Sequence, residues 1–458
     1  MAKYKCILCN YIYDEIMESK TFNLLDNTWT CPKCGEKKDS FKKLNYETFP
    51  KDIKLYNAIV IREDNPSIER LIDKCIDCGL CSEACQNIEC IANIDDGNNC
   101  VHCGNCIKAC PVGALRTKSH IDKVKEAIKK EITVAYIAPA SRVILGEYFN
   151  MPEGTNVEGK LITVLKKLGI NYVFDVAMGA DMTVIEEANE LARRIKNDGI
   201  LPMFTSCCPS WVSYVNNFYP SLSKNLSTCK SPIGMIDSLT KSYYQDIMGI
   251  DKIYSIAIVP CTSKKAEDNN VDTTLTVSEL ADYITAEEIV FELLEDSNYD
   301  KLLSESSSGG VKFGVSGGVL DSTFKTAYKI LSGDDYTSNL GARMNNGIKE
   351  VILDINGFKL KGAIVSGIAN LNKIIDLIDK GKCDYHLIEV MNCEGGCVNG
   401  AGAKVSKDYS KRRKYLCVIG YDRNNKLAYK NPDAIKIYKD FLEKPGSIEA
   451  EELLHKED

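Results

Sequence analysis

The chain has 458 residues, a formal net charge of −7 and 44% hydrophobic residues. This length suggests about three domains, and the hydrophobic fraction is enough for a sizeable buried core. The acidic balance argues against nucleic acid as a partner, because the longest basic block is the KRRK run at 411–414. The first residues lack the basic-then-apolar pattern of a secretory signal, and there is no apolar run of about 18 residues. We therefore expect a cytoplasmic protein without a membrane span.

The 21 cysteines are the most unusual feature of the composition. In a chain that is not exported, so many thiols indicate metal binding rather than disulfides, and they suggest an anaerobic cytoplasm. Most fall into a group near the N-terminus, two closely spaced runs and three later loops. The remaining ones, which we expect to act as small buried hydrophobic residues, are Cys90, Cys229, Cys383 and Cys417.

The first predicted domain, residues 1–48, carries two CxxC knuckles formed by Cys6, Cys9, Cys31 and Cys34. Four thiolates at this spacing form a tetrahedral site that suits either zinc or a single iron. The YIYD after the first knuckle and the WTCPKCG of the second resemble rubredoxin, which implies one electron-transferring iron. A structural zinc ribbon is the alternative. Asn10 stands where rubredoxins usually have glycine. Residues 49–57 are a predicted linker.

The second predicted domain, residues 58–122, contains the pattern CxxCxxCxxxC twice. In such repeats three closely spaced cysteines wrap one [4Fe-4S] cluster, and the fourth ligates the other cluster. The sequence therefore predicts a ferredoxin-like domain with two clusters. The expected ligand sets are Cys75, Cys78, Cys81 with Cys110, and Cys100, Cys103, Cys106 with Cys85.

From residue 123 to residue 458, strand-like apolar runs alternate with helical segments, which predicts a two-lobed α/β domain after the smaller α+β units. Three of the strand-like runs lead directly into cysteine loops: ILPMF into TSCCP, KIYSIAIVP into CTSKKAED, and DYHLIEVM into NCEGGC. Loops at the carboxyl ends of parallel strands gather in one crevice, so we expect these loops to meet.

The three loops supply enough thiolates for one more [4Fe-4S] cluster, and one thiol is left over. The four expected ligands are Cys208, Cys261, Cys393 and Cys397, and the spare thiol is Cys207. A further glycine-rich stretch, GVKFGVSGGVLDS at 310–322, lacks the lysine and serine of a phosphate-binding loop and is predicted to be a turn.

These loops, in this order, resemble the three signature sequences of the [FeFe]-hydrogenases, and the resemblance extends over nearly the whole chain. It implies an H-cluster, in which a [4Fe-4S] cluster is joined to a diiron unit with CO, cyanide and a dithiolate with a bridgehead amine. It implies that Cys397 is the bridging ligand and that Cys208, Cys261 and Cys393 hold the rest of the cubane. Cys207 matches the residue that passes protons to the amine.

The helical segment 181–198 carries two glutamates whose role depends on the resemblance. Its apolar stripe leaves Glu187 at the edge and Glu190 on the polar side, so the residue pattern alone predicts exposed carboxylates. The resemblance implies instead that Glu190, Ser227 and Glu187 relay protons through a water to Cys207. Partial burial suits this role, because it raises carboxyl and thiol pKa values towards the working pH.

The resemblance also identifies residues around the cofactor. It implies that Lys264, held by Glu267, donates a hydrogen bond to a cyanide ligand. It further implies that the cofactor pocket includes Pro139, Ala140, Phe204, Phe313 and Met391. Val259 and Ala140 depart from residues that are common in the family at these positions, and neither change removes a ligand.

Together these features predict an enzyme that reversibly reduces protons to H₂. The expected electron partner is a ferredoxin or a similar small carrier, and the expected assembly partners are the maturation proteins that install the diiron unit. The alternatives are a non-enzymatic hydrogenase-like Fe–S protein, such as a redox sensor or an assembly factor, and an electron-transfer protein that works through its rubredoxin-like domain.

Overall fold

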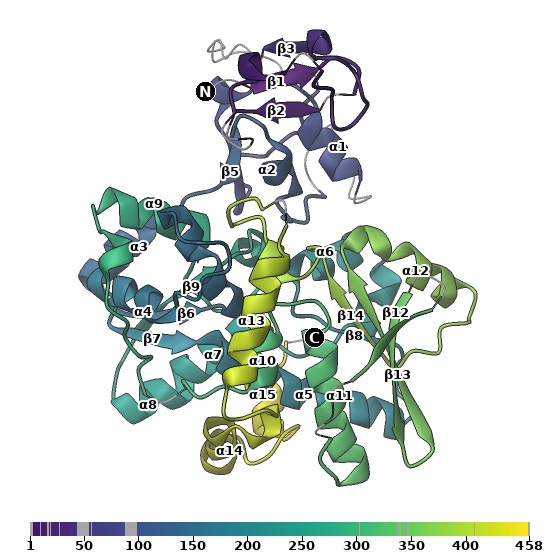
Figure 1. The fold of residues 1–458 in the computed structure, drawn as a ribbon. Helices are drawn as coiled ribbons and strands as arrows, with labels where there is room; N and C mark the ends of the chain where they lie inside the picture. Colours follow the sequence, from purple (N-terminus) through teal and green to yellow (C-terminus); the bar gives the residue numbers. More distant parts are fainter. Residues whose placement is uncertain are drawn as a thin grey trace.

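In a computed structural model, the structure describes residues 3–456 except 10, 16–17, 19, 27, 44–54, 56, 88–98, 302, 337, 339, 346–347 and 407. Asn10, most of the predicted linker 49–57 and Cys90 lie outside the described residues. The chain has a mixed α/β fold, with small cysteine-rich units at the N-terminal end and a larger two-lobed body below them (Figure 1). Across the described residues, every helix is too short or too polar to cross a membrane.

The N-terminal unit is a three-stranded antiparallel sheet in the order β2-β1-β3, formed by Ile12–Asp14, Lys3–Cys6 and Phe41–Lys43. So small a unit has little room for an aliphatic core, and aromatic rings fill the space instead. Phe22 stacks on Tyr4 with ring centroids 4.1 Å apart, and Trp29 packs edge-on against Phe22. This aromatic cluster leaves both cysteine knuckles at one end of the sheet.

The next unit has the repeated layout that its two cysteine runs predict. Helix α1 (Leu80–Gln86) follows the first run and α2 (Asn105–Ala109) follows the second, and strands β4 (Ile68–Arg70) and β5 (Leu115–Thr117) pair antiparallel. Gly104 precedes α2 with φ of 72°, a left-handed conformation that favours glycine. A Cβ at Gly104 would lie 2.7 Å from Thr262 Oγ1, so this unit packs closely on the body below.

The first lobe is built on a parallel sheet in the order β10-β9-β6-β7. Its strands are buried, apolar and β-branched, as expected where helices cover both faces. The strands are Thr273–Thr276, Ile253–Val259, Ile132–Ile137 and Tyr172–Asp175. The helices of this lobe are α3 (Ile121–Lys130), α4 (Glu158–Lys167), α7 (Pro232–Leu239), α8 (Gln245–Met248) and α9 (Val277–Ala286).

The second lobe is built on a mixed sheet in the order β11-β12-β13-β14-β8. An antiparallel edge is followed by three parallel strands that end near the first lobe. The strands are Ala342–Asn345, Ile348–Ile355, Phe358–Ser366, Leu387–Met391 and Met203–Phe204. The helices of this lobe are α6 (Pro209–Phe218), α11 (Gly318–Ser332) and α12 (Asn372–Asp379).

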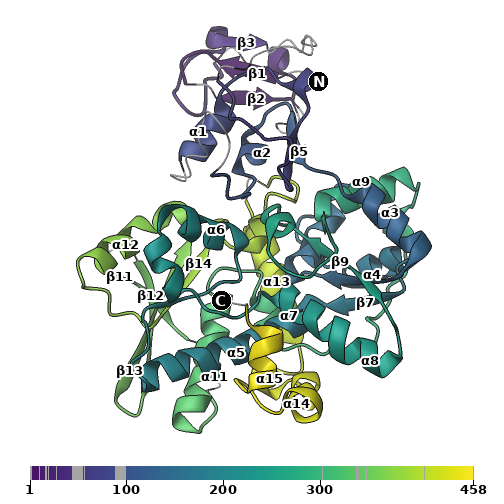
Figure 2. The ribbon, with the colours of Figure 1, turned by 180° about the vertical axis from the view of Figure 1, so that it is seen from behind.

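Helix α5 (Val176–Lys196) runs between the lobes, as both views of the ribbon show (Figures 1 and 2). Asp175 caps its first turn by accepting from the backbone N–H of Ala177 at 2.8 Å. Neighbouring helices pack on several of its sides, and so its glutamates are buried along with its apolar residues. The remaining helices are α10 (Ser308–Lys312), α13 (Ser410–Asp422), α14 (Pro432–Ile437) and α15 (Ile448–Leu454).

The glycine-rich stretch 310–322 bridges α10 and α11 rather than forming one simple turn. Gly310 lies where α10 crosses α5, and a Cβ there would overlap the Ala177 carbonyl oxygen and lie 2.8 Å from Asp181 Oδ1. The backbone of one helix therefore sits directly on the other.

Replacing Gly310 by alanine should force these two helices apart. We expect Gly310→Ala to lower the free energy of unfolding by about 1–3 kcal/mol, the usual range for overpacking a tight contact. Gly341→Ala is the matched control, because nothing lies within 4 Å of a Cβ added there. Thermal unfolding of the two variants measures the effect. Equal melting temperatures would contradict the close contact.

Candidate active site

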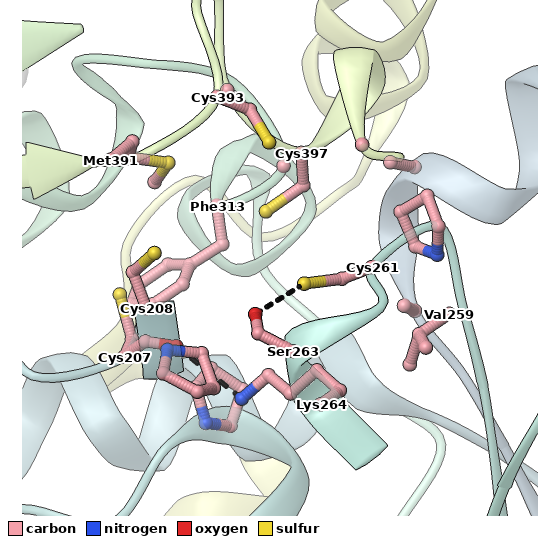
Figure 3. Close-up of a pocket in the computed structure, with 18 of the residues that line it drawn as sticks. Cys207, Cys208, Val259, Cys261, Ser263, Lys264, Phe313, Met391, Cys393 and Cys397 are labelled. Atoms are coloured by element: carbon pink, nitrogen blue, oxygen red, sulfur yellow. Dashed lines mark hydrogen bonds between the residues drawn. The ribbon is translucent and has the colours of Figure 1, made fainter. Parts of the chain in front are cut away.

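The three cysteine loops meet at the ends of strands from both lobes, which confirms the prediction that each follows a strand. Strand β8 leads into Cys207 and Cys208, β9 into Cys261, and β14 into Cys393. Around their ends lies a cavity. The side chains of Cys207, Cys208, Cys261, Cys393 and Cys397 all line it, and their sulfur atoms point towards a common centre (Figure 3).

The thiols in this cavity are stable as neutral groups but would be costly as bare thiolates. Burial raises the pKa of Cys208 to about 12, and the neighbouring Cys261 would raise it further if charged. Burial also raises the pKa of Cys397 well above its usual value, again with a contribution from the surrounding thiols. A cationic iron core would remove this penalty, because metal binding deprotonates the thiols that coordinate it. The donor set therefore fits an iron–sulfur cluster.

Glycines allow the third loop to reach the other two. Gly396, directly before Cys397, has φ of 102°, and a Cβ there would lie 2.6 Å from the backbone nitrogen of Ser316. A Cβ at Gly400 would overlap the carbonyl oxygen of Pro260, beside Cys261. The GGC sequence is thus needed for close approach, and it brings Cys397 into the cavity beside Cys261.

Lys264 is a buried cation on the cavity wall. Its Nζ donates to Glu267 Oε1 at 2.6 Å and to the Cys207 carbonyl oxygen at 3.3 Å. Burial alone would lower the pKa of Lys264, but the Glu267 carboxylate outweighs burial and leaves this pKa raised. The predicted pairing with Glu267 is confirmed. Lys264 is therefore charged and can donate a hydrogen bond to an anionic group in the cavity.

The apolar residues that the sequence singled out divide into two groups. Pro139, Ala140, Phe313 and Met391 line the cavity. Phe204 does not line it: its ring packs on Trp211 with centroids 5.2 Å apart, and its carbonyl oxygen accepts from the Ser227 backbone N–H at 2.8 Å. Phe204 was expected at the cofactor because it precedes the TSCCP loop, but the strand turns its side chain into the core of the second lobe.

Glu187, Glu190 and Ser227 lie together behind Cys207, on and beside α5. Ser227 Oγ donates to Glu190 Oε2 at 2.8 Å, and Arg194 Nη2 donates to Glu190 Oε1 at 2.6 Å. Glu187 is completely buried and Glu190 is only 5% exposed. The exposure that the helical pattern predicts for both residues is wrong, because α5 is covered on its polar side as well.

Glu187 is the carboxyl group of this set with the fewest hydrogen-bond partners. Neither of its oxygens makes a hydrogen bond of normal geometry to another described residue, although the Ser206 backbone amide lies close enough to favour the ionised form. Burial, followed by the charge on Glu190, raises the pKa of Glu187 to about 8. A carboxyl group with this pKa can both accept and donate a proton near neutral pH.

The second run of the ferredoxin-like unit also reaches the cavity. Cys103 is one of the lining residues, and burial raises its pKa above the usual value. Thr262, next to Cys261, donates from Oγ1 to the His102 carbonyl oxygen at 2.7 Å. Lys108 Nζ donates to the Asn399 carbonyl oxygen. A cluster held by this run would therefore lie beside the cavity.

The four N-terminal cysteines form a tighter group than the others. Cys6 and Cys34 Sγ lie 3.7 Å apart, and Cys9 and Cys31 Sγ lie 3.4 Å apart. Four sulfurs about 2.3 Å from one ion in tetrahedral geometry would be about 3.8 Å from each other. All four sulfur atoms lie within 4.8 Å of one another. This geometry fits a single metal ion rather than a cluster.

Sequence reasoning missed several residues of the site. Ser263 Oγ lies 3.0 Å from Cys261 Sγ, Arg194 pairs with Glu190, and Cys103 lines the cavity. Arg194 has a signal in the sequence, because it stands four positions after Glu190 on a helix. Ser263 and Cys103 have no such signal, since their positions depend on how the loops and the two units pack.

Comparisons with known proteins agree with this geometry. The family model "Iron only hydrogenase large subunit, C-terminal domain" matches residues 131–401, "Iron hydrogenase small subunit" matches 408–457, and "4Fe-4S binding domain" matches 94–116. Iron hydrogenase 1 of Clostridium pasteurianum is 37% identical over 96% of this chain and 85% of its own length. Protein NAR1 of Arabidopsis thaliana is 30% identical over 74% of this chain and 80% of its own.

Solved structures show the same relationship. An apo [FeFe]-hydrogenase, HydA1 from Chlamydomonas reinhardtii, aligns with a TM-score of 0.67 and 28% identity, covering 74% of this chain and 98% of that one. The chain belongs to the iron-only, or [FeFe], hydrogenase family. Its relatives include both hydrogenases and a cytosolic iron-sulfur assembly component.

The raised pKa of Glu187 implies that the stability of the fold depends on pH. Its carboxyl group ionises near pH 4.5 in an unfolded chain but keeps its proton to about pH 8 in the fold. Folding therefore takes up a proton between these values, so stability falls as pH rises through this window and stays constant above it. Glu187→Gln should remove that loss.

Melting temperatures of Glu187→Gln and the unaltered chain test this directly. The variant should gain stability relative to the unaltered chain as the pH rises from about 5 to about 8. Glu452→Gln, at an exposed position, is the control and should show a constant difference. A constant difference for Glu187→Gln as well would mean that Glu187 is ionised throughout.

Proposed function

We propose that this protein is an active [FeFe]-hydrogenase that reversibly reduces protons to H₂ with electrons from a low-potential donor such as ferredoxin. The observation that carries the proposal is the position of Cys207. Its thiol lines the same cavity as four ligand thiols, is not needed as a ligand, and has the buried pair Glu187 and Glu190 behind it.

The proposed cofactor is an H-cluster, with Cys208, Cys261, Cys393 and Cys397 as its thiolate ligands and Cys397 as the bridge to a diiron unit with CO, cyanide and a dithiolate. The hydrogen chemistry is supplied by the diiron unit. We also propose two [4Fe-4S] clusters, one on Cys75, Cys78, Cys81 and Cys110, the other on Cys85, Cys100, Cys103 and Cys106, and one mononuclear iron on the N-terminal knuckles.

Protons would travel along side chains that are already close together. Glu190 and Ser227 share a hydrogen bond of 2.8 Å, and Glu187 is near enough to Glu190 for their charges to interact. A water between Glu187 and Cys207 would complete the relay. Burial keeps the Cys207 pKa well above its usual value, so this residue holds its proton as a thiol until a stronger base accepts it.

Electrons would reach the cavity from the ferredoxin-like unit. Cys103 contributes to the cavity wall, and the Thr262 to His102 hydrogen bond joins the two units beside Cys261. This contact supports transfer from the cluster held by the second run to the H-cluster. Proteins tune the potentials of such clusters through burial and hydrogen bonds to sulfur, as the Ser263 hydroxyl near Cys261 Sγ could do.

The remaining wall residues would orient and isolate the cofactor. The Lys264 ammonium can donate to cyanide, and Pro139, Ala140, Phe313 and Met391 supply apolar surface. A dry, apolar cavity strengthens the electrostatic interactions inside it.

The proposed domains are residues 1–48 (rubredoxin-like), 49–57 (linker), 58–122 (ferredoxin-like) and 123–458 (catalytic). We propose a cytoplasmic location, with dedicated maturation proteins as the source of the diiron unit. The alternative is a non-enzymatic role, as an Fe–S assembly factor, redox sensor or electron-transfer protein, since a cytosolic iron-sulfur assembly component is among the relatives.

The variant Cys207→Ala tests the catalytic role against the non-enzymatic one. It should keep the iron of all clusters but lose H₂ turnover by at least about a hundredfold, the usual contribution of a positioned proton donor. Cys417→Ala, a partly buried cysteine outside the cavity, is the matched control and should keep full activity. Iron content and H₂ evolution after maturation measure both. Full activity in Cys207→Ala would reject the relay.

The N-terminal site gives an independent prediction. The anaerobically purified chain should show the visible absorption of an iron tetrathiolate, and Cys9→Ser should remove that absorption together with about one iron while the cubane iron stays. Elemental analysis and absorption spectra measure this. Zinc in the place of that iron would refute the rubredoxin-like assignment in favour of a structural zinc ribbon.

A further inference from the structure

The C-terminal tail lies against the segment that carries the relay serine. After α15 the chain pairs with residues 227–230: the Lys230 backbone N–H donates to the Leu454 carbonyl at 2.9 Å, and the Lys456 N–H donates to the Thr228 carbonyl at 2.8 Å. His455 lies opposite Cys229 in this bridge. The tail belongs to the part matched by the small-subunit model, whereas the relay belongs to the large-subunit match. Helix α15, which leads into the tail, lies close to α14 and α5 in both views (Figures 1 and 2).

His455 connects the relay to a second buried carboxylate. Its Nδ1 lies 2.7 Å from Thr228 Oγ1, and its Nε2 lies 3.3 Å from Glu186 Oε2. Cys229 Sγ lies 3.9 Å from His455 Nε2 and 3.7 Å from Glu190 Oε2. The Cys229 thiol therefore stands between the imidazole and the outer glutamate of the proposed relay.

Within this group, His455 and Glu190 are each slightly exposed. The His455 side chain is 7% exposed, whereas that of Glu186 is completely buried. Cys229 is also completely buried. Burial raises the Cys229 pKa well above its usual value, so the residue stays a thiol that can both donate and accept a weak hydrogen bond.

The cluster of Glu190, Cys229 and His455 is compact enough to resemble a metal site, but its hydrogen bonds argue for proton transfer instead. All three ligand atoms lie within 4.8 Å of one another. Both imidazole nitrogens have an oxygen partner, Thr228 Oγ1 or Glu186 Oε2, and both also lie within 4.0 Å of Cys229 Sγ. A histidine with hydrogen-bond partners at both nitrogens is suited to pass protons from one to the other.

We propose that His455 gives the relay a second proton port, in which the imidazole exchanges protons with solvent and passes them through Cys229 to Glu190. The inference rests on the proposed hydrogenase function. In one transfer, an N–H proton of the imidazolium moves to Cys229 Sγ while the S–H proton of Cys229 moves to the Glu190 carboxylate. The imidazole becomes neutral, Cys229 is again a thiol, and no electrons move.

The charged and titratable groups around His455 favour this direction of transfer. Glu186 and Glu190 face it from α5, Tyr438 donates to Glu186 at 2.5 Å, and Lys456 follows it in the tail. The Glu190 carboxylate is the nearest base beyond Cys229 and can accept its proton.

Proton supply limits turnover most at alkaline pH, so the port is tested there. His455→Gln and Cys229→Ala should each lower H₂ evolution about twofold or more above about pH 8, with little loss at acidic pH, because one of two parallel routes is removed. The double variant should be no worse than either single variant, since both changes block one route.

Cys229→Ser should keep most activity, and Cys383→Ala, a partly buried cysteine in another part of the second lobe, should keep all of it. An unchanged pH profile in both single variants, or additive losses in the double variant, would overturn the port.

A second measurement does not depend on hydrogenase activity. In protein that carries only its cubane clusters, the infrared S–H band of Cys229, identified as the band missing in Cys229→Ala, is followed after transfer to D₂O. Exchange to S–D should be at least about tenfold slower in His455→Gln, because a buried thiol loses its proton-transfer partner. Equal exchange rates would overturn the port. Absence of H₂ turnover in the unaltered, matured chain would instead reject the proposed hydrogenase function. The exchange rates would then still test whether His455 passes protons to Cys229.

Discussion

The structure depends on bringing buried cysteine thiols from two separate sheets to one point. Burial and mutual repulsion raise the pKa of Cys208 and Cys397, so these thiols could not be held together as thiolates without a cationic core. The backbone makes the convergence possible, because Gly396 and Gly400 let the third loop lie against the first lobe. The parallel strands of the two sheets end at this point and hold the three cysteine loops in fixed positions. Such loops can carry functional side chains that the sheets themselves do not present.

Burial also sets the properties of the two glutamates on helix α5. Its position between the lobes buries Glu187 and Glu190, and burial turns an ordinary carboxylic acid into one whose pKa, for Glu187, is about 8. Keeping the Glu187 carboxyl group protonated costs stability at neutral pH, and the tight contact at Gly310 is among those that hold the helix in place. The ferredoxin-like unit contacts Thr262 beside Cys261, and the C-terminal tail pairs with the segment that carries Ser227.

Much of this architecture could be predicted from the sequence. The cysteine spacings and the apolar runs ahead of the three loops predicted the strand-end site, because both are local features with few alternative explanations. Burial of Glu187 and Glu190 could not be predicted from helical periodicity, since it arises from helices that contact α5 from distant parts of the sequence. Phe204 illustrates the same limit, because a side chain next to a functional loop can point into the core. His455 gave no signal, since its link to Cys229 depends on a pairing between residues more than two hundred positions apart.

The central claim is that four converging thiolates hold an H-cluster whose reactive side faces Cys207. Infrared absorption in the CO and cyanide stretching region, measured on the chain after treatment with hydrogenase maturation proteins, tests it most directly. We expect sharp bands from both ligand types in the unaltered chain and none in Cys397→Ser, the variant that lacks the proposed bridging thiolate. Absence of these bands from an unaltered chain that carries its full complement of cubane iron would contradict it.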